Sequence, residues 1–295
     1  MNREFSTVTT AKCILAGEHA VIRGGPALVF PVRGCTLSLQ FKPAHGECGA
    51  EFSGTYSDDI HLLFWSVLEH GLELTQHQLN EIQGKFILVN NIPVGAGLGA
   101  SAALCVALTR WFIASGIVPA SDLFSFAKRL EDLFHHKSSG LDIAAVMANS
   151  ALRFQQGESK PLELSWKPRW KLSYSEQIGM TSHCVKKVNE LIQRDPILGQ
   201  QIDQRMIDAV NQASIALEQQ GPSALDHLAN AINQTRTCFH QWGLAGGRIE
   251  THMNELLRHG ALAVKPTGSG DGGYVLSLWA PDAKLPNSIQ FVELD

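Results

Sequence analysis

The spacing of apolar residues along the chain changes near residue 100. Before this point, short runs of aliphatic and β-branched residues, such as 36–41 and 86–89, are separated by glycine and proline, which is typical of strands. From Ser101 onward the apolar residues follow the helical spacing i, i+4, i+7 and i+8, at Leu104, Leu108, Trp111 and Phe112. We therefore expect strands over residues 1–90 and a helix that begins near Ser101.

The rest of the chain divides into further predicted elements around one polar stretch. A helix is expected over residues 120–135, after Pro119 and with Ser121 as its cap. Residues 155–168 are polar, contain prolines and have no periodicity, so we expect the domain boundary there. Beyond it the pattern predicts helices over 183–193, 199–219, 223–241 and 247–259, then strands over 273–279 and 288–292. The sequence thus predicts two domains, residues 1–165 and 166–295.

Composition narrows the class of protein. With 295 residues, 44% of them hydrophobic, the chain has enough apolar material for two cores. A net charge of -4 gives no basic surface for nucleic acid or an anionic membrane. No run approaches the roughly 18 apolar residues of a membrane span, and the first residues lack the apolar core of a signal peptide, so we expect a cytoplasmic protein. The 6 cysteines form no C-x-x-C pair, which argues against a disulfide framework and a zinc site.

A glycine-rich loop joins the strand predicted at 86–89 to the helix predicted from Ser101. Gly95, Gly97 and Gly99 allow backbone conformations closed to other residues, and they let N–H groups approach an anion. The loop leads into a helix N-terminus, whose free donors favour phosphate. It matches neither the Walker A pattern nor the dinucleotide fingerprint. By itself, such a turn is as compatible with an ordinary loop as with a phosphate site.

Two other segments carry polar residues in unusual places. Residues 11–21 form an apolar run that contains Lys12, Glu18 and His19, which by themselves would be read as surface groups. Residues 265–274 form a second glycine-rich loop, which comes directly before the strand predicted at 273–279.

In chain order, these three segments resemble the three signatures of the GHMP kinases. Residues 91–103, with the sequence P-x-G-A-G-L-G-x-S-A-A, resemble the second signature, and Gly-Glu-His-Ala-Val at 17–21 is the form of the first signature found in mevalonate kinases. The resemblance implies an α+β fold of two domains. The N-terminal domain would hold a mixed sheet with a left-handed βαβ crossover, and the C-terminal domain would be ferredoxin-like. The active site would lie between them.

The resemblance also implies which residues bind ATP. The phosphates would be held by a loop of Pro93, Gly95, Ala96, Gly97, Leu98, Gly99, Ala100, Ser101 and Ala102. The third-signature loop of Gly268, Ser269, Gly270 and Asp271 would approach the same site. Magnesium would be bound by Ser101 and Glu131, one hydroxyl and one carboxylate, which suits a hard cation that keeps several waters.

Catalytic and acceptor-binding residues follow from the same resemblance. Glu131 precedes Asp142 by eleven positions, and Asp142 ends a Ser-Gly-x-Asp turn, as in mevalonate kinases. Asp142 would orient or deprotonate the acceptor hydroxyl, and Lys12 would lower the pKa of that hydroxyl and stabilise negative charge. Glu18, His19 and Ser182 would line the acceptor pocket together with Lys12 and Asp142, and His19 would donate a hydrogen bond to the acceptor.

The sequence departs from the family at several positions. Ala100 stands where the second signature usually has a serine, so one phosphate contact is lost. In the third signature, Ser269, Asp271 and Tyr274 replace the usual alanine, glycine and cysteine. A carboxylate at Asp271 would repel phosphates unless it points away or helps to hold the metal.

The adjacent His135 and His136 would point in different directions on a helix end, which argues against a metal pair.

The expected reaction is the ATP-dependent phosphorylation of (R)-mevalonate to 5-phosphomevalonate, a step of isoprenoid precursor synthesis, with Mg2+ as the cofactor. Three alternatives remain. The acceptor could be another hydroxyl compound, such as phosphomevalonate, a sugar or homoserine. The chain could be a catalytically inactive binding protein of the same fold, or a decarboxylating relative. The resemblance also suggests a homodimer.

Overall fold

The structure is a computed structural model that describes residues 3–134, 138–219 and 221–294. His135 and His136, whose pairing was considered above, lie outside the described residues. Contacts divide the chain into two compact units. The first unit contains the residues up to Lys12, Arg33–Val94 and Gly99–Asn149, and the second contains Cys13–Val32, Gly95–Leu98 and the residues from Ser150 onward.

These units interleave along the chain. The two contiguous domains expected from the sequence, residues 1–165 and 166–295, stay a prediction. In the structure, the two longest strands, β1 (Phe5–Ala16) and β2 (Ala27–Pro43), each contribute residues to both units. A pattern of polarity read along the chain detects a polar linker, but it does not detect a strand that continues from one core into another.

The first unit contains a mixed sheet. Its strands β3 (Gly49–Ser53) and β4 (Gly84–Asn90) are parallel neighbours, and β4 pairs antiparallel with β2 from Leu37↔Asn90 to Pro43↔Gly84. Strand β1 pairs with β2. The helix α1 (Ser57–Leu74) connects β3 to β4, which makes the βαβ crossover that the resemblance implied. The left hand of this crossover stays a prediction.

Helix α1 was not expected, because residues 1–90 were read as strands, and that part of the prediction was wrong. The helix buries an apolar stripe at i, i+4, i+7 and i+8, formed by Ile60, Phe64, Val67 and Leu68. The same spacing identified the helix near Ser101. The polar residues between these positions hid the stripe in a region rich in short strands.

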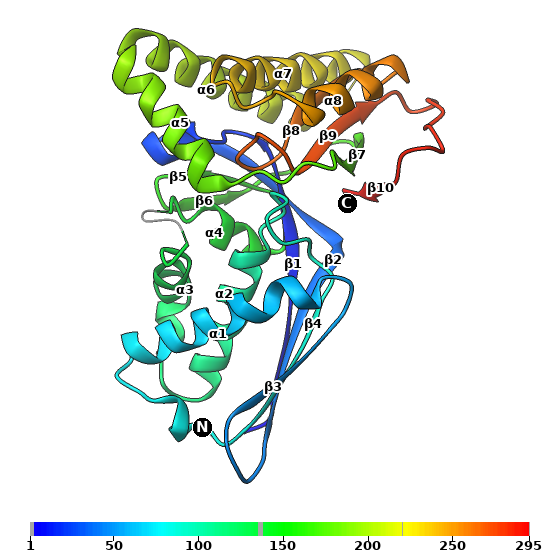
Figure 1. The fold of residues 1–295 in the computed structure, drawn as a ribbon. Coiled ribbons are helices and arrows are strands. Elements are labelled where there is room, and N and C mark those ends of the chain that lie inside the picture. The colour runs from blue at the N-terminus through cyan, green and yellow to red at the C-terminus, as the bar shows by residue number, and fades with distance from the viewer. Residues whose placement is uncertain (1–2, 135–137, 220, 295) are drawn as a thin grey trace. The chain divides into compact units, whose positions relative to one another are not determined.

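Three further α-helices complete the first unit. Their bounds are α2 (Ala100–Ala114), α3 (Leu123–Glu131) and α4 (Leu141–Ala148). Together with α1 they lie on one side of the mixed sheet (Figure 1). Helix α2 is buried over most of its surface, which confirms the apolar helix expected from Ser101. The expected cap was wrong, because Ser121 lies inside the 3-10 turn η3 (Ala120–Asp122) and its hydroxyl bonds to the Asp122 side chain. A second 3-10 turn, η2 (Leu79–Glu81), precedes β4.

The second unit contains an antiparallel sheet with the strand order β10-β7-β9-β8. Its strands are β7 (Arg169–Tyr174), β8 (Ala263–Pro266), β9 (Tyr274–Trp279) and β10 (Phe291–Glu293). Strand β9 lies between β7 and β8, which are joined through helices, and this split βαβ arrangement is that of ferredoxin-like domains. The α+β fold expected from the resemblance is therefore confirmed.

The helices between β7 and β8 follow the sequence prediction closely. They are α5 (Thr181–Arg194), α6 (Pro196–Glu218), α7 (Pro222–Gln241) and α8 (Arg248–Arg258). Helices α6, α7 and α8 lie together over one face of this sheet (Figure 1). None of the helices in the described part of the chain is long and apolar enough to cross a membrane.

The polar stretch 155–168 is more ordered than expected. It begins in a hairpin of β5 (Leu152–Gln155) and β6 (Glu158–Pro161), and β5 pairs with the first residues of β2. All of β6 is exposed, so its sequence carries no apolar alternation by which a strand could be predicted.

Candidate active site

Lys12 and Asp142 form an ion pair in the first unit. The Lys12 Nζ atom lies 2.9 Å from Asp142 Oδ2. Lys12 is buried on β1, whereas the Asp142 side chain is 28% exposed in the first turn of α4. Gly140, at φ 82°, precedes α4 and lets the chain turn sharply into the helix. The structure thus brings together the lysine and the carboxylate that the sequence analysis paired, and it leaves the carboxylate partly accessible.

Glu131 lies close to this pair at the end of α3. Its side chain is buried, and burial raises its pKa to about 8, with a further increase from the Asp142 carboxylate. Ser138 and Lys12 act in the opposite direction. Glu131 also contributes to a raised pKa of the Cys105 thiol on α2, after the larger effect of burial. Ser101 lies four residues before Cys105 on the same helix, so Glu131 is near the face of α2 that carries Ser101.

The donor set around Glu131 is suited to magnesium. A buried carboxyl with a pKa of about 8 is mostly protonated at neutral pH, and a divalent cation beside it would favour the charged form. One carboxylate and one hydroxyl are also what Mg2+ requires when phosphate oxygens and waters supply the other ligands. Among the described residues there is no cluster of three or more His, Cys, Asp or Glu side chains of the kind that binds a metal by protein ligands alone.

Gly99 of the second signature contacts Lys12, the lysine of this ion pair. Gly99 adopts φ 79°, and a Cβ atom there would lie 2.8 Å from Lys12 Cε and 2.9 Å from Lys12 Cγ. Helix α2 begins at Ala100, directly after Gly99, and no side chain caps it. The first-turn N–H groups of a helix have no partner within the helix, so this end of α2 can bind an anion beside Lys12.

In the second unit, the remainder of this loop lies against the third signature. Gly97, at φ 84°, lies so close to the Thr267 carbonyl that a Cβ would be 2.5 Å from its oxygen. The Ala96 carbonyl accepts a hydrogen bond of 3.1 Å from the N–H of Tyr274, the first residue of β9. The two glycine-rich segments are therefore in direct backbone contact, and a side chain at Gly97 would prevent this close approach.

Asp271 occupies a backbone conformation that favours glycine. Its φ is 57°, its N–H donates to the Leu244 carbonyl at 2.7 Å, and its carbonyl accepts from the Gln177 side chain at 2.7 Å. The departure from the family at this position therefore changes both the charge of the loop and its conformational cost.

His19 is neutral and buried in the second unit. Burial lowers the pKa of His19 to about 4, although the bond to Ser269 opposes this effect. Nε2 lies 2.8 Å from the Ser269 carbonyl oxygen, and since a carbonyl only accepts, Nε2 carries the hydrogen. Nδ1 can then accept a hydrogen bond but cannot donate one. This changes the donor role that the resemblance implied for His19.

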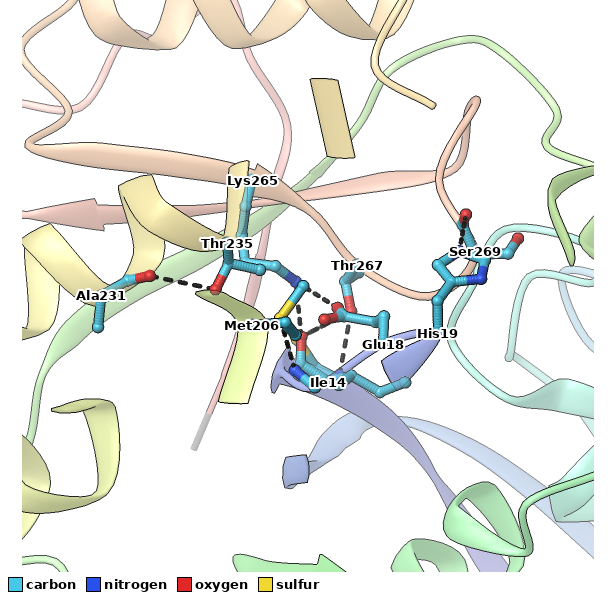
Figure 2. Close-up of polar contacts among 11 residues, drawn as sticks. Ile14, Glu18, His19, Met206, Ala231, Thr235, Lys265, Thr267 and Ser269 are labelled. Carbon is cyan, nitrogen blue, oxygen red and sulfur yellow. Dashed lines mark hydrogen bonds and ion pairs between the residues drawn. The ribbon is translucent and has the colours of Figure 1, made fainter. Parts of the chain in front are cut away.

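Glu18 has a partner that the sequence analysis did not assign. Lys265, on β8, is fully buried and forms an ion pair with Glu18 (Figure 2). The signal was present in the sequence, because Lys265 follows the apolar residues Ala263 and Val264 and a charged residue in a buried run requires an opposite charge.

The remaining predicted residues have simpler surroundings. Pro93, Leu98 and Ala102 are buried, and Ser182 is exposed in the first turn of α5. Its neighbour Thr181 has its Oγ1 atom 3.3 Å from Ser269 Oγ, a contact that the sequence analysis missed. The roles of all these residues, and the position of the active site between domains, stay predictions.

Comparison with known proteins agrees with the signatures. Residues 63–150 match the GHMP kinases N terminal domain. The chain is 27% identical over 283 residues to a mevalonate kinase of Archaeoglobus fulgidus, a match that covers 91% of this chain and 90% of the relative. It is 24% identical over 300 residues to a mevalonate kinase of Aeropyrum pernix, covering 95% and 90%.

The fold is also similar to that of a solved mevalonate kinase. The crystal structure of L. major mevalonate kinase in complex with R-mevalonate has a TM-score of 0.79 and 20% sequence identity, over 100% of this chain and 98% of the other. The resemblance drawn from the three signatures is therefore confirmed: residues 63–150 match the GHMP kinases N terminal domain, and the chain is an ATP-dependent kinase.

Proposed function

We propose that this chain transfers the γ-phosphoryl group of ATP to the 5-hydroxyl of (R)-mevalonate, producing ADP and 5-phosphomevalonate. The observation that carries the proposal is the ion pair between Lys12 and Asp142, a buried cation beside a partly exposed carboxylate. The relatives named mevalonate kinase support the choice of acceptor, because they match more than 90% of this chain. The Gly-Glu-His-Ala-Val sequence at 17–21 supports the same choice.

Lys12 and Asp142 have complementary tasks in this reaction. The acceptor hydroxyl donates a hydrogen bond to Asp142, which orients its oxygen toward the γ-phosphorus. The new O–P bond forms as the bond between the γ-phosphorus and the β,γ-bridging oxygen breaks, and that electron pair leaves with ADP. The hydroxyl proton passes to Asp142. Lys12 stabilises the negative charge of the transition state, where most of the catalytic demand of phosphoryl transfer lies.

The phosphates of ATP would be bound mainly by backbone groups. The N–H groups in the first turn of α2 provide donors, and the glycines before this helix carry no side chain that would block a phosphate. Glu131 and Ser101 would hold magnesium, which when bound neutralises charge on the nucleotide phosphates. The loss of a serine at Ala100 leaves these backbone donors in place.

A panel of acceptors tests this function directly. The purified chain is incubated with ATP and MgCl2, and ADP release is measured separately with mevalonate, phosphomevalonate, homoserine and galactose. We expect stimulation by mevalonate alone, with the Asp142→Asn variant as the inactive control. Stimulation by another acceptor would retain the chemistry and replace the substrate. ATP binding without turnover in any reaction would instead favour a catalytically inactive binding protein.

A further inference from the structure

Side-chain contacts join residues 14–19 of the first signature to residues 265–269 of the third (Figure 2). Strands β1 and β8, which lead into these segments, belong to different sheets and share no ladder of backbone hydrogen bonds. Three alternate residues of the third signature make the connection instead: Lys265, Thr267 and Ser269. All of these contacts lie within the second unit.

Lys265 makes the central contact. Its ammonium group donates to the Ile14 carbonyl at 3.0 Å and forms the ion pair with Glu18, and both charged side chains are buried. The same ammonium lies 5.4 Å from the centre of the Phe239 ring. A buried ammonium is tolerated only when charge and hydrogen bonds compensate it, so the positions of Glu18 and Ile14 are tied to that of Lys265.

Thr267 strengthens the same connection. Its hydroxyl accepts from the Ile14 N–H at 3.1 Å and donates to the Ile14 carbonyl, with an oxygen–oxygen distance of 3.2 Å. Ile14 thus has both of its backbone polar groups bound by side chains of the third signature. Met206 contributes from α6, since its sulfur lies 3.2 Å from the Gly17 nitrogen.

These contacts come directly before a residue in an unusual conformation. His19 follows Glu18 and has φ 60° and ψ -46°, outside the regions that a histidine commonly adopts. Such a conformation persists only when its surroundings hold it. On one side His19 is held by Glu18, and on the other its ring bonds to the Ser269 carbonyl and packs edge-on against Trp242, with ring centres 5.0 Å apart.

We propose that Lys265 is a positioning residue for acceptor binding, which acts by holding the Glu18–His19 turn in the orientation that presents His19 to the acceptor. The proposal rests on the function proposed above and on the expectation from the sequence that His19 lines the acceptor pocket. Lys265 itself is fully buried, so we assign it no direct contact with either substrate. Its removal therefore changes the affinity for the acceptor more than the rate of the chemical step.

The test compares two lysines that resemble each other. Lys265→Met removes the charge at similar volume. Lys171→Met is the control, because Lys171 is also a mostly buried strand lysine of the second unit and is paired with Glu293, away from the three signatures. Thr267→Val is a milder variant, which removes both bonds to Ile14 without leaving a buried charge. Each protein is assayed at a temperature where circular dichroism shows it to be folded.

Two readouts separate positioning from general stability. We expect Lys265→Met to raise KM for mevalonate by about tenfold or more while kcat changes by less than about threefold, which is the pattern for an interaction that binds acceptor and transition state alike. The second readout is the 15N signal of the His19 imidazole N–H that is bonded to Ser269, which is assigned by its absence from the spectrum of His19→Gln. In Lys265→Met this signal should disappear or exchange rapidly with solvent. Thr267→Val should shift both readouts in the same direction by less, and Lys171→Met should change neither.

The proposal fails if folded Lys265→Met or folded Thr267→Val keeps both the wild-type KM and the His19 signal. It also fails if Lys171→Met raises KM as much as Lys265→Met, because the effect would then be one of stability. A wild-type chain that phosphorylates no acceptor would contradict the proposed function instead, and the His19 signal would still report whether Lys265 holds the turn.

Discussion

Gly99 lies directly against the side chain of Lys12, so that a single added carbon on the glycine would overlap the lysine. This contact links the start of α2, where we propose that phosphate binds, to the cation of the proposed catalytic pair. It also means that the position of Lys12 depends on a residue that has no side chain.

Gly99→Ala should therefore lower kcat. The new Cβ would meet Lys12 at 2.8 Å and would force it away from Asp142. Gly116→Ala is a matched control, because Gly116 has a similar φ of 75° in the same unit and nothing within 4 Å of its Cβ position. Both variants should lose about 1–2 kcal/mol of stability from the left-handed backbone. Only Gly99→Ala should lose turnover, and equal kcat values in the two variants would contradict the prediction.

Asp142→Asn should reduce kcat by about a thousandfold, since it removes the charge that orients and accepts the hydroxyl proton. ATP binding, measured by calorimetry, should be largely kept. Lys12 would lose its partner while buried, so the assay must be run well below the melting temperature. Turnover within tenfold of the wild-type rate would exclude a catalytic role for this carboxylate.

Ser101→Ala should raise the magnesium concentration needed for half-maximal turnover, because one of the two proposed protein ligands is lost. Ser115→Ala, at the other end of α2, serves as the control for substitution on the same helix. An unchanged magnesium titration would remove Ser101 from the metal site.

Asp271→Gly should lower KM for ATP by about two- to tenfold, because it removes a negative charge from a loop proposed to face phosphates. Asp271→Asn separates charge from conformation, since asparagine tolerates φ of 57° as aspartate does but carries no charge. We expect both variants to show the effect. If only the glycine variant does, the cause is the backbone, and if neither does, the carboxylate points away from ATP.

His19 predicts a specific dependence of stability on pH. Its pKa is about 4 when folded and about 6.5 when unfolded, so between these values the unfolded chain binds more protons. The contribution of neutral His19 to the free energy of unfolding is complete above pH 6.5 and is lost as the pH falls toward 4. From pH 7.5 to 5, His19 should account for about 2 kcal/mol of lost stability.

His19→Gln isolates this contribution. Glutamine can still donate to the Ser269 carbonyl but does not titrate, so the variant should lose about 2 kcal/mol less than wild type over the same range in urea unfolding. His252, whose pKa is also lowered by burial, is present in both proteins and cancels in the difference. Parallel pH profiles for the two proteins would show that His19 is not buried in its neutral form.

The elements that could be predicted from sequence are those whose determinants are local. The helices from Thr181 to Arg258 carry continuous amphipathic stripes, and the glycine-rich loops can be recognised from their composition. The pairing of Lys12 with Asp142 was reached only through resemblance, because nothing in the spacing of two residues so far apart indicates contact.

Other features depend on contacts between segments that are distant in the sequence, and the sequence indicates them only weakly. Strand β8 has four residues, too few for a periodic pattern, and its one charged residue is explained only by Glu18, which lies 247 positions earlier. The neutral state of His19 likewise depends on burial by Phe239 and Trp242 from a distant part of the chain. A charged residue inside an apolar run, such as Lys265, therefore indicates a partner of opposite charge elsewhere in the chain.

The division of the chain between two cores has a consequence for biosynthesis. Residues 13–32 are made well before the rest of their unit, which is built mostly from Ser150 onward. The ion pair between Glu18 and Lys265 therefore cannot form until Lys265, which lies 247 positions after Glu18, has left the ribosome. Until those later residues are made, the apolar run of residues 13–32 lacks its partners and is exposed to chaperones and to aggregation. Cutting the gene after Asn149 would keep the first unit on one fragment but would separate residues 13–32 from most of the second unit.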